Sequence, residues 1–368
     1  MSIIKFTNEQ KLIQKEIRKF ATSELEPIAD EIEKNAAFPT DIINNLSELG
    51  FSALIIPEKY GGVEMDTTSL CITIEELSRI YASVGSILAV NNCLIAYPII
   101  KYANENQKEK YLNKLSSGEI GGFISEPEID VSEEEFEAKK SDNGYLVNGK
   151  RDFVLNGEAA KFFIMPFQTS DGKAFYFLEK DDCELEKNNI LGIRAAGTTS
   201  IKFNELILKN ENCFITEQNG EKALNDIRDY ANICFSAISL GLAQASLEAA
   251  TKYSKERKQF GKYICEFPMI QEMLTEMKIK IETARLLVYD AASKYDNAQD
   301  YSVSSKIARI YCGDMAVNCG LDAIQIYGGY GYIKDYPVER YFRDAKVLQV
   351  LETTPRLLKS DIAKELLK

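Results

Sequence analysis

The sequence predicts an α+β protein in which one β domain lies between two helical regions. Residues before 121 place apolar side chains at helical spacing, residues 121–220 contain short β-rich runs separated by turn residues, and residues 221–368 return to long helical periods. We therefore expect a helical N-terminal domain over 1–120, a middle β domain over 121–220 and a C-terminal helical bundle over 221–368.

The N-terminal region predicts a series of helices. The first starts after Thr7 and stops at Pro27, and the second starts after Pro39 and stops before Gly50. Pro57 and the glycines that follow it break the helical pattern and predict a loop. The remaining predicted helices span 69–79, 84–102 and 107–115.

The middle region is rich in β-branched and aromatic residues, which favour strands. Gly149 and Gly157 each follow an asparagine, and Asn-Gly pairs are typical of turns. The predicted strand segments span 145–149, 153–157, 162–167, 174–178, 201–203 and 206–208.

The C-terminal region predicts long helices over 221–257, 267–298, 302–327 and 337–350. Gly261 is expected to be the C-terminal glycine of the first of them. Thr354 with Pro355 after it matches an N-cap followed by proline at the first helical position, which predicts a last helix up to residue 368.

Composition excludes several classes of partner. The 44 basic and 56 acidic residues give a net charge of −12, which argues against nucleic acid or an anionic membrane as the main partner. No run approaches the roughly 20 apolar residues of a membrane span, and the first residues lack a signal-peptide pattern, so we expect a cytoplasmic protein. The eight cysteines are scattered and include no CxxC, which predicts reduced thiols and no metal site.

The chain contains no histidine. This absence excludes Ser-His-Asp and Cys-His catalysis, zinc sites that depend on imidazole, and a histidine base. Acid–base chemistry must therefore use Asp, Glu, Tyr, Lys or Cys.

Residues 325–354 combine a glycine cluster, arginines and one carboxylate, Glu352. Gly328 and Gly329 could admit phosphates to the backbone, but the residues alone favour the end of a helix. Glu352 lies in a short connection between two predicted helices, where either a site carboxylate or an exposed surface glutamate fits.

Two further segments carry candidate residues. Arg257 could hold a phosphate through two hydrogen bonds, with Phe260 against a flat ring, while the plain alternative is a solvated basic helix end. Ser125 could hydrogen-bond a ligand, or the Glu-Pro that follows it could simply end a strand.

Read together, these motifs resemble the acyl-CoA dehydrogenase family over essentially the whole chain. The resemblance implies a helical N-terminal domain, a middle β-barrel-like domain and a C-terminal four-helix bundle, assembled as a homotetramer or dimer with FAD between domains and against a neighbouring subunit. The matching segments include PEKYGG (57–62), SEP (125–127), GYLVNGKRDFVLNG (144–157), LGIRAAGTTSIKF (191–203), LGLAQASLEAATKYSKERKQFGKYI (240–264), QIYGGYGY (325–332) and RYFRDAK (340–346).

The resemblance also implies a role for each candidate. Glu352 falls on the glutamate that removes the α proton of an acyl thioester while the β hydride passes to flavin. Arg257 and Phe260 fall on contacts to the FAD of the partner subunit. The other positions implied to contact FAD are Gln325, Gly328 and Gly329 on its pyrophosphate and adenosine side, Ile124, Ser125, Phe153 and Leu155 near the flavin ring, and Thr354 beside the base.

Departures from the family pattern cluster at the flavin ring and at the thioester carrier. Phe153 replaces a tryptophan, Leu155 replaces a threonine, and Thr353 replaces the glycine after the base. The usual SEPxxGSD is SEPEIDVS here, and the position of the arginine that assists CoA binding is Asn232. Thr353 and Asn232 are therefore the expected substrate positions.

We therefore expect bound FAD and an acyl thioester substrate whose carrier is either CoA or an acyl or peptidyl carrier protein. The implied electron acceptor is an electron-transfer flavoprotein. An alternative left open is a divergent member without ordinary dehydrogenase activity, acting as a binding or scaffold subunit or in non-redox thioester chemistry.

Overall fold

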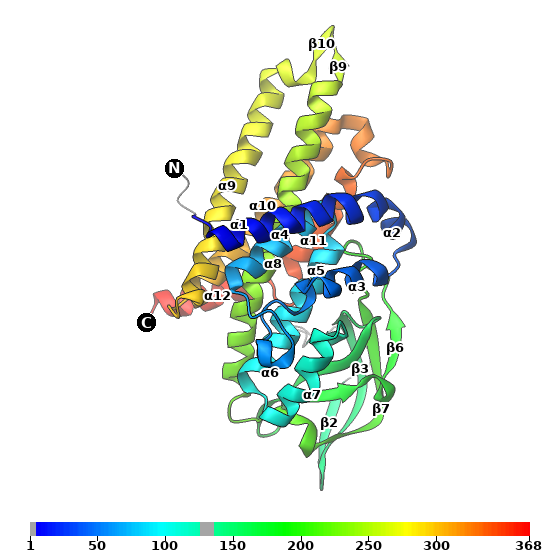
Figure 1. Cartoon of the computed structure of the whole chain (residues 1–368), viewed down its shortest axis with the longest axis vertical. Helices are drawn as coiled ribbons and strands as arrows, with labels where there is room; N and C mark the ends of the chain where they lie inside the picture. Colours follow the sequence, from blue (N-terminus) through cyan, green and yellow to red (C-terminus); the bar gives the residue numbers. More distant parts are fainter. Residues whose placement is uncertain (1–4, 126–135) are drawn as a thin grey trace.

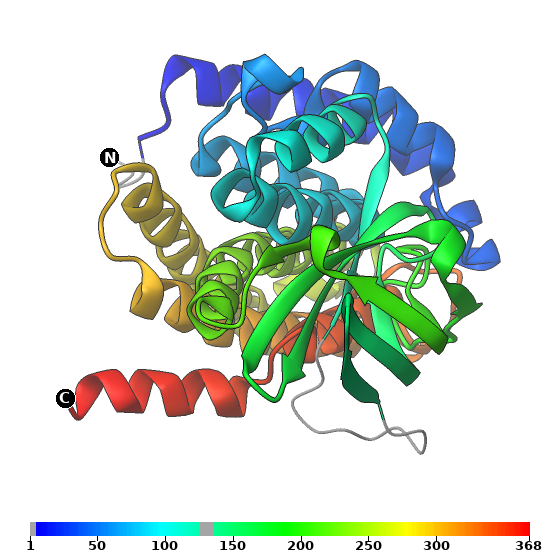
Figure 2. The ribbon, with the colours of Figure 1, turned by 90° about the horizontal axis from the view of Figure 1, so that it is seen from below.

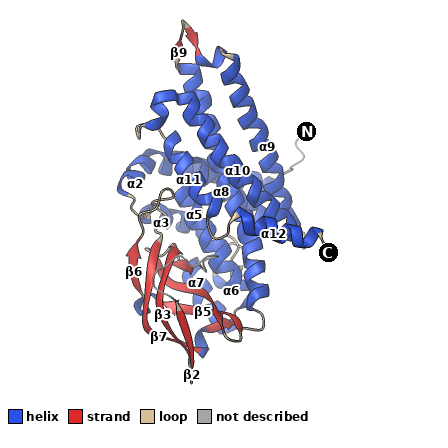
Figure 3. Ribbon diagram, turned by 180° about the vertical axis from the view of Figure 1, so that it is seen from behind, coloured by secondary structure: helices blue, strands red, loops and turns tan. Residues whose placement is uncertain are grey.

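The computed structural model describes residues 5–125 and 136–368. The molecule is elongated, with a β-sheet at one end and helices making up the rest (Figures 1 and 3). Helices precede and follow the strands along the chain, which confirms the predicted α+β class. The part of the acidic SEPEIDVS segment after Ser125 lies outside the described residues.

The first N-terminal helix begins directly after Thr7, as predicted. Thr7 and Gln10 form a reciprocal capping box at the start of α1, with hydrogen bonds of 3.0 and 3.1 Å. Short π-helical turns follow two of the helices, at Ala21–Leu25 and Asn91–Ala96. The helices are α1 (Asn8–Phe20), α2 (Ala29–Asn35), α3 (Thr40–Glu48), α4 (Thr67–Ile80), α5 (Ala82–Val90), α6 (Tyr97–Tyr102) and α7 (Glu105–Ser116).

Two asparagines explain why the helix predicted over 84–102 contains a π-helical turn. The amide of Asn92 donates to the carbonyls of Leu88 and Ser52, at 3.0 and 3.2 Å. The side-chain oxygen of Asn91 accepts from the backbone N–H of Gly121, at 3.0 Å. The Asn91 bond connects the helix to the first strand of the sheet, and the Asn92 bonds connect it to the turn at Ser52, contacts that propensity along one helix does not reveal.

The sheet is mixed and open. Its strand order is β6-β7-β3-β1-β4-β5-β8, with β2 paired to β3, and β1 runs parallel to β4. It does not close into a barrel. The strands are β1 (Ile120–Ile124), β2 (Glu137–Ser141), β3 (Gly144–Leu155), β4 (Ala160–Thr169), β5 (Gly172–Glu179), β6 (Glu184–Lys187), β7 (Thr199–Lys209) and β8 (Cys213–Ile215).

The sheet corrects two predicted strand breaks. Segments 145–149 and 153–157 were expected to be separate, yet β3 runs from the first into the second and ends at Leu155, because the register of its pairing with β7 shifts between Val147 and Gly149. The Asn148–Gly149 pair therefore forms an irregularity within the strand and not a turn. Segments 201–203 and 206–208 likewise form one strand, β7.

Both faces of the sheet are covered. Phe162 and Ile164 on β4 pack into the large core shared with the helices. Phe163 and Met165, the alternate residues of the same strand, pack into a second core on the far face.

The C-terminal region is built on α8, a helix of 37 residues that passes through the middle of the molecule (Figure 1). A Cβ at Gly241 would lie 2.2 Å from the carbonyl oxygen of Glu75, so only glycine allows α4 to pack this closely against α8. The last helix extends away from the others (Figure 2). The helices are α8 (Gly220–Glu256), α9 (Pro268–Asp296), α10 (Ser302–Tyr327), α11 (Val338–Val350) and α12 (Pro355–Leu366).

Three predicted helix ends have different outcomes. Gly261 does not end α8, which stops at Glu256; it occupies the turn between β9 (Lys258–Gln259) and β10 (Lys262–Tyr263), with φ of 83°. Gly328 does end α10, with φ of 60° and an N–H that donates to Gln325. Thr354 caps α12 by accepting from the N–H of Leu357 at 3.5 Å.

Two helical stretches, Ala82–Tyr102 and Gly220–Glu256, are long and apolar enough to span a membrane by length and composition. They are 94% and 83% buried inside the protein, which is the pattern of core helices. All eight cysteines are free thiols, as predicted, and the described residues contain no cluster of His, Cys, Asp and Glu that could hold a metal.

Candidate active site

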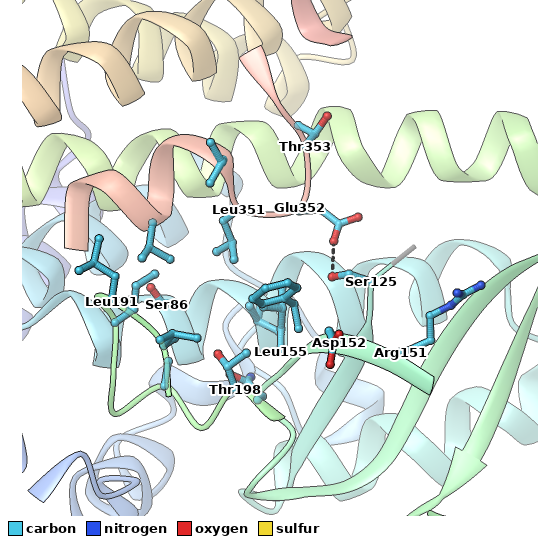
Figure 4. Close-up of a pocket in the computed structure, with 18 of the residues that line it drawn as sticks. Ser86, Ser125, Arg151, Asp152, Leu155, Leu191, Thr198, Leu351, Glu352 and Thr353 are labelled. Atoms are coloured by element: carbon cyan, nitrogen blue, oxygen red, sulfur yellow. Dashed lines mark hydrogen bonds between the residues drawn. The ribbon is translucent and has the colours of Figure 1, made fainter. Parts of the chain in front are cut away.

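A cavity of about 630 Å³ opens between β3, α5 and the segment that follows α11 (Figure 4). Asn156, directly after β3, donates its amide to the carbonyl of Ile87 at 3.1 Å and so ties the sheet to α5. Ser86 and Leu191 lie at the end of the cavity away from Glu352 (Figure 4). The walls come from Ser86 and Val90, from Ser125, from residues 150–156, from residues 189–198 and from residues 346–354.

Glu352 points into this cavity from the turn after α11 (Figure 4). Its side chain is only 2% exposed, so the interpretation as a surface glutamate is wrong. The hydroxyl of Ser125 donates to its Oε2 at 2.7 Å. Glu352 has φ of 63°, a left-handed conformation that is uncommon for a residue with a side chain and often marks a functional site.

Arg228 on α8 is a site residue that the sequence reasoning missed. Its Nε lies 3.6 Å from Oε1 of Glu352, and its side chain is 20% exposed. It precedes Asn232 by four residues, so the two side chains lie one turn apart on the same face of α8. Helical spacing around Asn232 was the signal that could have identified it.

Asn232 itself does not line the cavity. It is 2% exposed inside α8, and within the described chain its side-chain nitrogen has no hydrogen-bond partner. An arginine, Arg228, thus lies beside the carboxylate of Glu352. It is one helical turn before Asn232, the position that the resemblance implied for an arginine.

The other residues expected near a flavin ring or a substrate divide into two groups. Ser125, Phe153, Leu155, Thr353 and Thr354 line the cavity. Ile124 does not, because its side chain is fully buried in the core on the far face of the sheet.

The residues expected to contact the cofactor of a partner subunit lie elsewhere. The β9–β10 hairpin is at the opposite end of the molecule from the sheet (Figure 1), and Phe260 on it is 93% exposed. The guanidinium of Arg257 lies 5.5 Å from the ring centre of Tyr330, next to the glycine cluster. Arg257, Phe260, Gln325, Gly328 and Gly329 are thus outside the cavity of their own chain.

Asp344 on α11 holds the cavity loop 189–198 and was also missed. Its Oδ1 accepts from the N–H of Ile193 at 2.6 Å, and Ile193 has a φ of 51° that a β-branched residue rarely adopts. Asp344 is 1% exposed, and burial raises the pKa of its carboxyl to about 7. One buried carboxyl thus fixes a strained part of the cavity wall.

Comparisons with known proteins show the family to which the chain is related. Family models described as acyl-CoA dehydrogenase, N-terminal domain and C-terminal domain match residues 7–119 and 222–367. The chain is 37% identical to an acyl-CoA dehydrogenase of Bacillus subtilis over 98% of both chains. It is similar to the butyryl-CoA dehydrogenase structure from Megasphaera elsdenii, with 33% identity, a TM-score of 0.93 and 100% coverage of both chains. It is also similar to the prolyl acyl carrier protein oxidase AnaB, with 27% identity, a TM-score of 0.90, and coverage of 98% of this chain and 100% of that one.

Proposed function

Because this chain belongs to the acyl-CoA dehydrogenase family of oxidoreductases that act on CH–CH groups, we propose that it is an FAD-dependent dehydrogenase of an acyl thioester with Glu352 as its base. The product is the α,β-unsaturated thioester. The observation that carries the proposal is a glutamate side chain, 2% exposed, that opens onto an apolar cavity in a chain without histidine.

The surroundings of Glu352 suit removal of an α proton. The Ser125 hydroxyl donates to the carboxylate at 2.7 Å and Nε of Arg228 lies 3.6 Å from it, so these two groups orient the side chain that accepts the proton. Leu351 and Val350 contribute apolar wall beside it, and exclusion of water leaves the carboxylate less solvated and therefore a better base. The α proton passes from the substrate carbon to a Glu352 oxygen.

The residues of the cavity fit a flat, largely apolar ring system. The volume of the cavity lies within the range of about 300–1,000 Å³ that is usual for ligand sites. Its walls are mainly apolar, with a few polar groups that point into it. Phe153 and Leu155 would lie against the flavin ring, with Thr198 and Ser125 as hydrogen-bonding groups at its edge. Bound FAD would accept the β hydrogen together with its electron pair. An electron-transfer flavoprotein is the proposed acceptor of the electrons from the reduced flavin.

The same proposal includes a homo-oligomer, a dimer or tetramer, in which the hairpin of one subunit meets the cofactor of another. An exposed phenylalanine ring at position 260 suits an interface, and a Cβ at Gly328 or Gly329 would meet nothing within 4 Å, which leaves room for a ligand. Light scattering is expected to give two or four times the 41.4 kDa of one chain. A monomer that binds one FAD per chain would contradict this arrangement.

The purified protein is expected to be yellow and to bleach when a suitable thioester is added without oxygen. Butyryl-CoA and a prolyl carrier protein are the two probes, because similar proteins are named for those substrates. Bleaching by butyryl-CoA assigns a CoA carrier, and bleaching only by the carrier protein assigns the second class. Protein that stays colourless after incubation with FAD would overturn the dehydrogenase proposal and favour a binding or scaffold role.

A further inference from the structure

Glu352 is the central residue of a three-residue turn. The N–H of Thr353 donates to the carbonyl of Leu351 at 2.8 Å. Glu352, which lies between these two residues, has φ of 63°. This is the hydrogen-bond pattern of a γ-turn with positive φ, which is rare and strained. Such a conformation persists only where neighbouring groups hold it in place.

Arg309 on α10 contacts the first residue of this turn and the end of the helix before it. Its Nη2 donates to the carbonyl of Leu348 in the last turn of α11 and, at 3.1 Å, to the carbonyl of Leu351. Carbonyls at a helix end lack partners within the helix, and a cation there also complements the helix dipole. Leu351 therefore accepts two hydrogen bonds, one from the turn and one from Arg309.

Arg309 is only 2% exposed, and no carboxylate pairs with it among residues 5–125 and 136–368. Burial lowers the pKa of its guanidinium to about 10, so it remains charged at neutral pH. Its other contact is the ring of Phe235, whose centre lies 5.4 Å away. Half-buried Arg285 and buried Arg340, by contrast, pair with Glu75 and Asp30.

A buried cation without a counter-ion is unfavourable, and an apolar residue of similar volume would normally stabilise such a site better. Packing of α10 alone therefore gives no reason for a guanidinium at this position. The two carbonyls that Arg309 binds give such a reason, because both belong to the segment that carries Glu352.

We propose that Arg309 is a positioning residue that holds the Glu352 turn in its strained conformation. The inference rests on the proposed role of Glu352 as the base. Arg309 does not touch the carboxylate; it acts through the carbonyls of Leu348 and Leu351.

Arg309→Met tests the proposal, with Arg285→Met as the matched control. Both variants remove a guanidinium from a helix of the C-terminal region, but Arg285 lies on α9, is 22% exposed and forms an ion pair with Glu75. With whichever thioester bleaches the wild type, butyryl-CoA or prolyl carrier protein, Arg309→Met is expected to lower kcat about 10²-fold and to change KM less than threefold. Amide hydrogen exchange across 348–357 is expected to rise in Arg309→Met and to stay at the wild-type rate in Arg285→Met.

Arg309→Lys covers the case in which the methionine variant does not fold. Lysine keeps the charge but lacks the planar fork that reaches two carbonyls, so kcat is expected to fall about tenfold with faster exchange at 348–357. Wild-type kcat and exchange in a folded variant would overturn the inference. If Glu352→Gln is inactive in the same assay, the proposed function stands and only the role of Arg309 fails; if Glu352→Gln is fully active, both fail.

Discussion

Replacing Glu352 with glutamine is expected to lower the rate of dehydrogenation by about 10²–10⁴-fold, the usual contribution of a positioned general base. Glutamine keeps the shape of the side chain and can still accept a hydrogen bond from Ser125, but it cannot take up the α proton. The measurement is the rate at which the thioester bleaches the flavin without oxygen. FAD content is expected to stay at the wild-type level, because the change removes no bulk from the cavity.

Glu282→Gln provides the control, since it makes the same change on α9 at a side chain that is 51% exposed. It is expected to bleach at the wild-type rate. A fully active Glu352→Gln variant would rule out Glu352 as the base, and it would leave the described part of the cavity with Asp152 as its other carboxylate.

Asp344→Asn is expected to make the protein more stable than the wild type at pH 8, and to exceed the wild type by a smaller margin at pH 5. Burial raises the pKa of Asp344 from 3.8 to about 7. Between these values the folded state binds a proton that the unfolded state has released, so stability is fully present below the lower value and is lost as the pH rises through the higher one. From pH 5 to pH 8 this loss is about 3 kcal/mol, and asparagine removes it because it does not ionise.

Urea unfolding of both proteins at the two pH values measures this effect. Asparagine can still accept from the N–H of Ile193, so the cavity loop keeps its hydrogen bond. Asp182→Asn, at an exposed position, is the control and is expected to show the same pH dependence as the wild type. An equal pH dependence in Asp344→Asn and the wild type would mean that Asp344 is not held protonated by burial.

Local sequence signals predicted much of this fold because they act within one element. The capping box at Thr7, the cap at Thr354 and the glycine end at Gly328 all depend on residues within a few positions of each other. Gly261 was misplaced for a related reason: positive φ suits a helix end and a hairpin turn equally, and only the pairing of β9 with β10 decides between them.

The site was predictable where a residue carries its own chemistry and was missed where its role depends on distant neighbours. Glu352 could be proposed as the base because its residue type and its place in the sequence match the family resemblance, whereas the residues alone left a surface glutamate open. Arg228, Asp344 and Arg309 act on groups that are 124, 151 and 39 or 42 residues away in the chain, and a charged residue in a helix is ordinary without those partners. These residues are recognised as part of the site by their positions inside the folded protein, which the sequence alone does not give.

The left-handed backbone at Glu352 limits what evolution can place there. Glycine, asparagine and aspartate adopt this conformation most readily, whereas β-branched residues resist it. A descendant of this protein that no longer used the proposed base could keep the turn most easily by acquiring glycine or asparagine at 352.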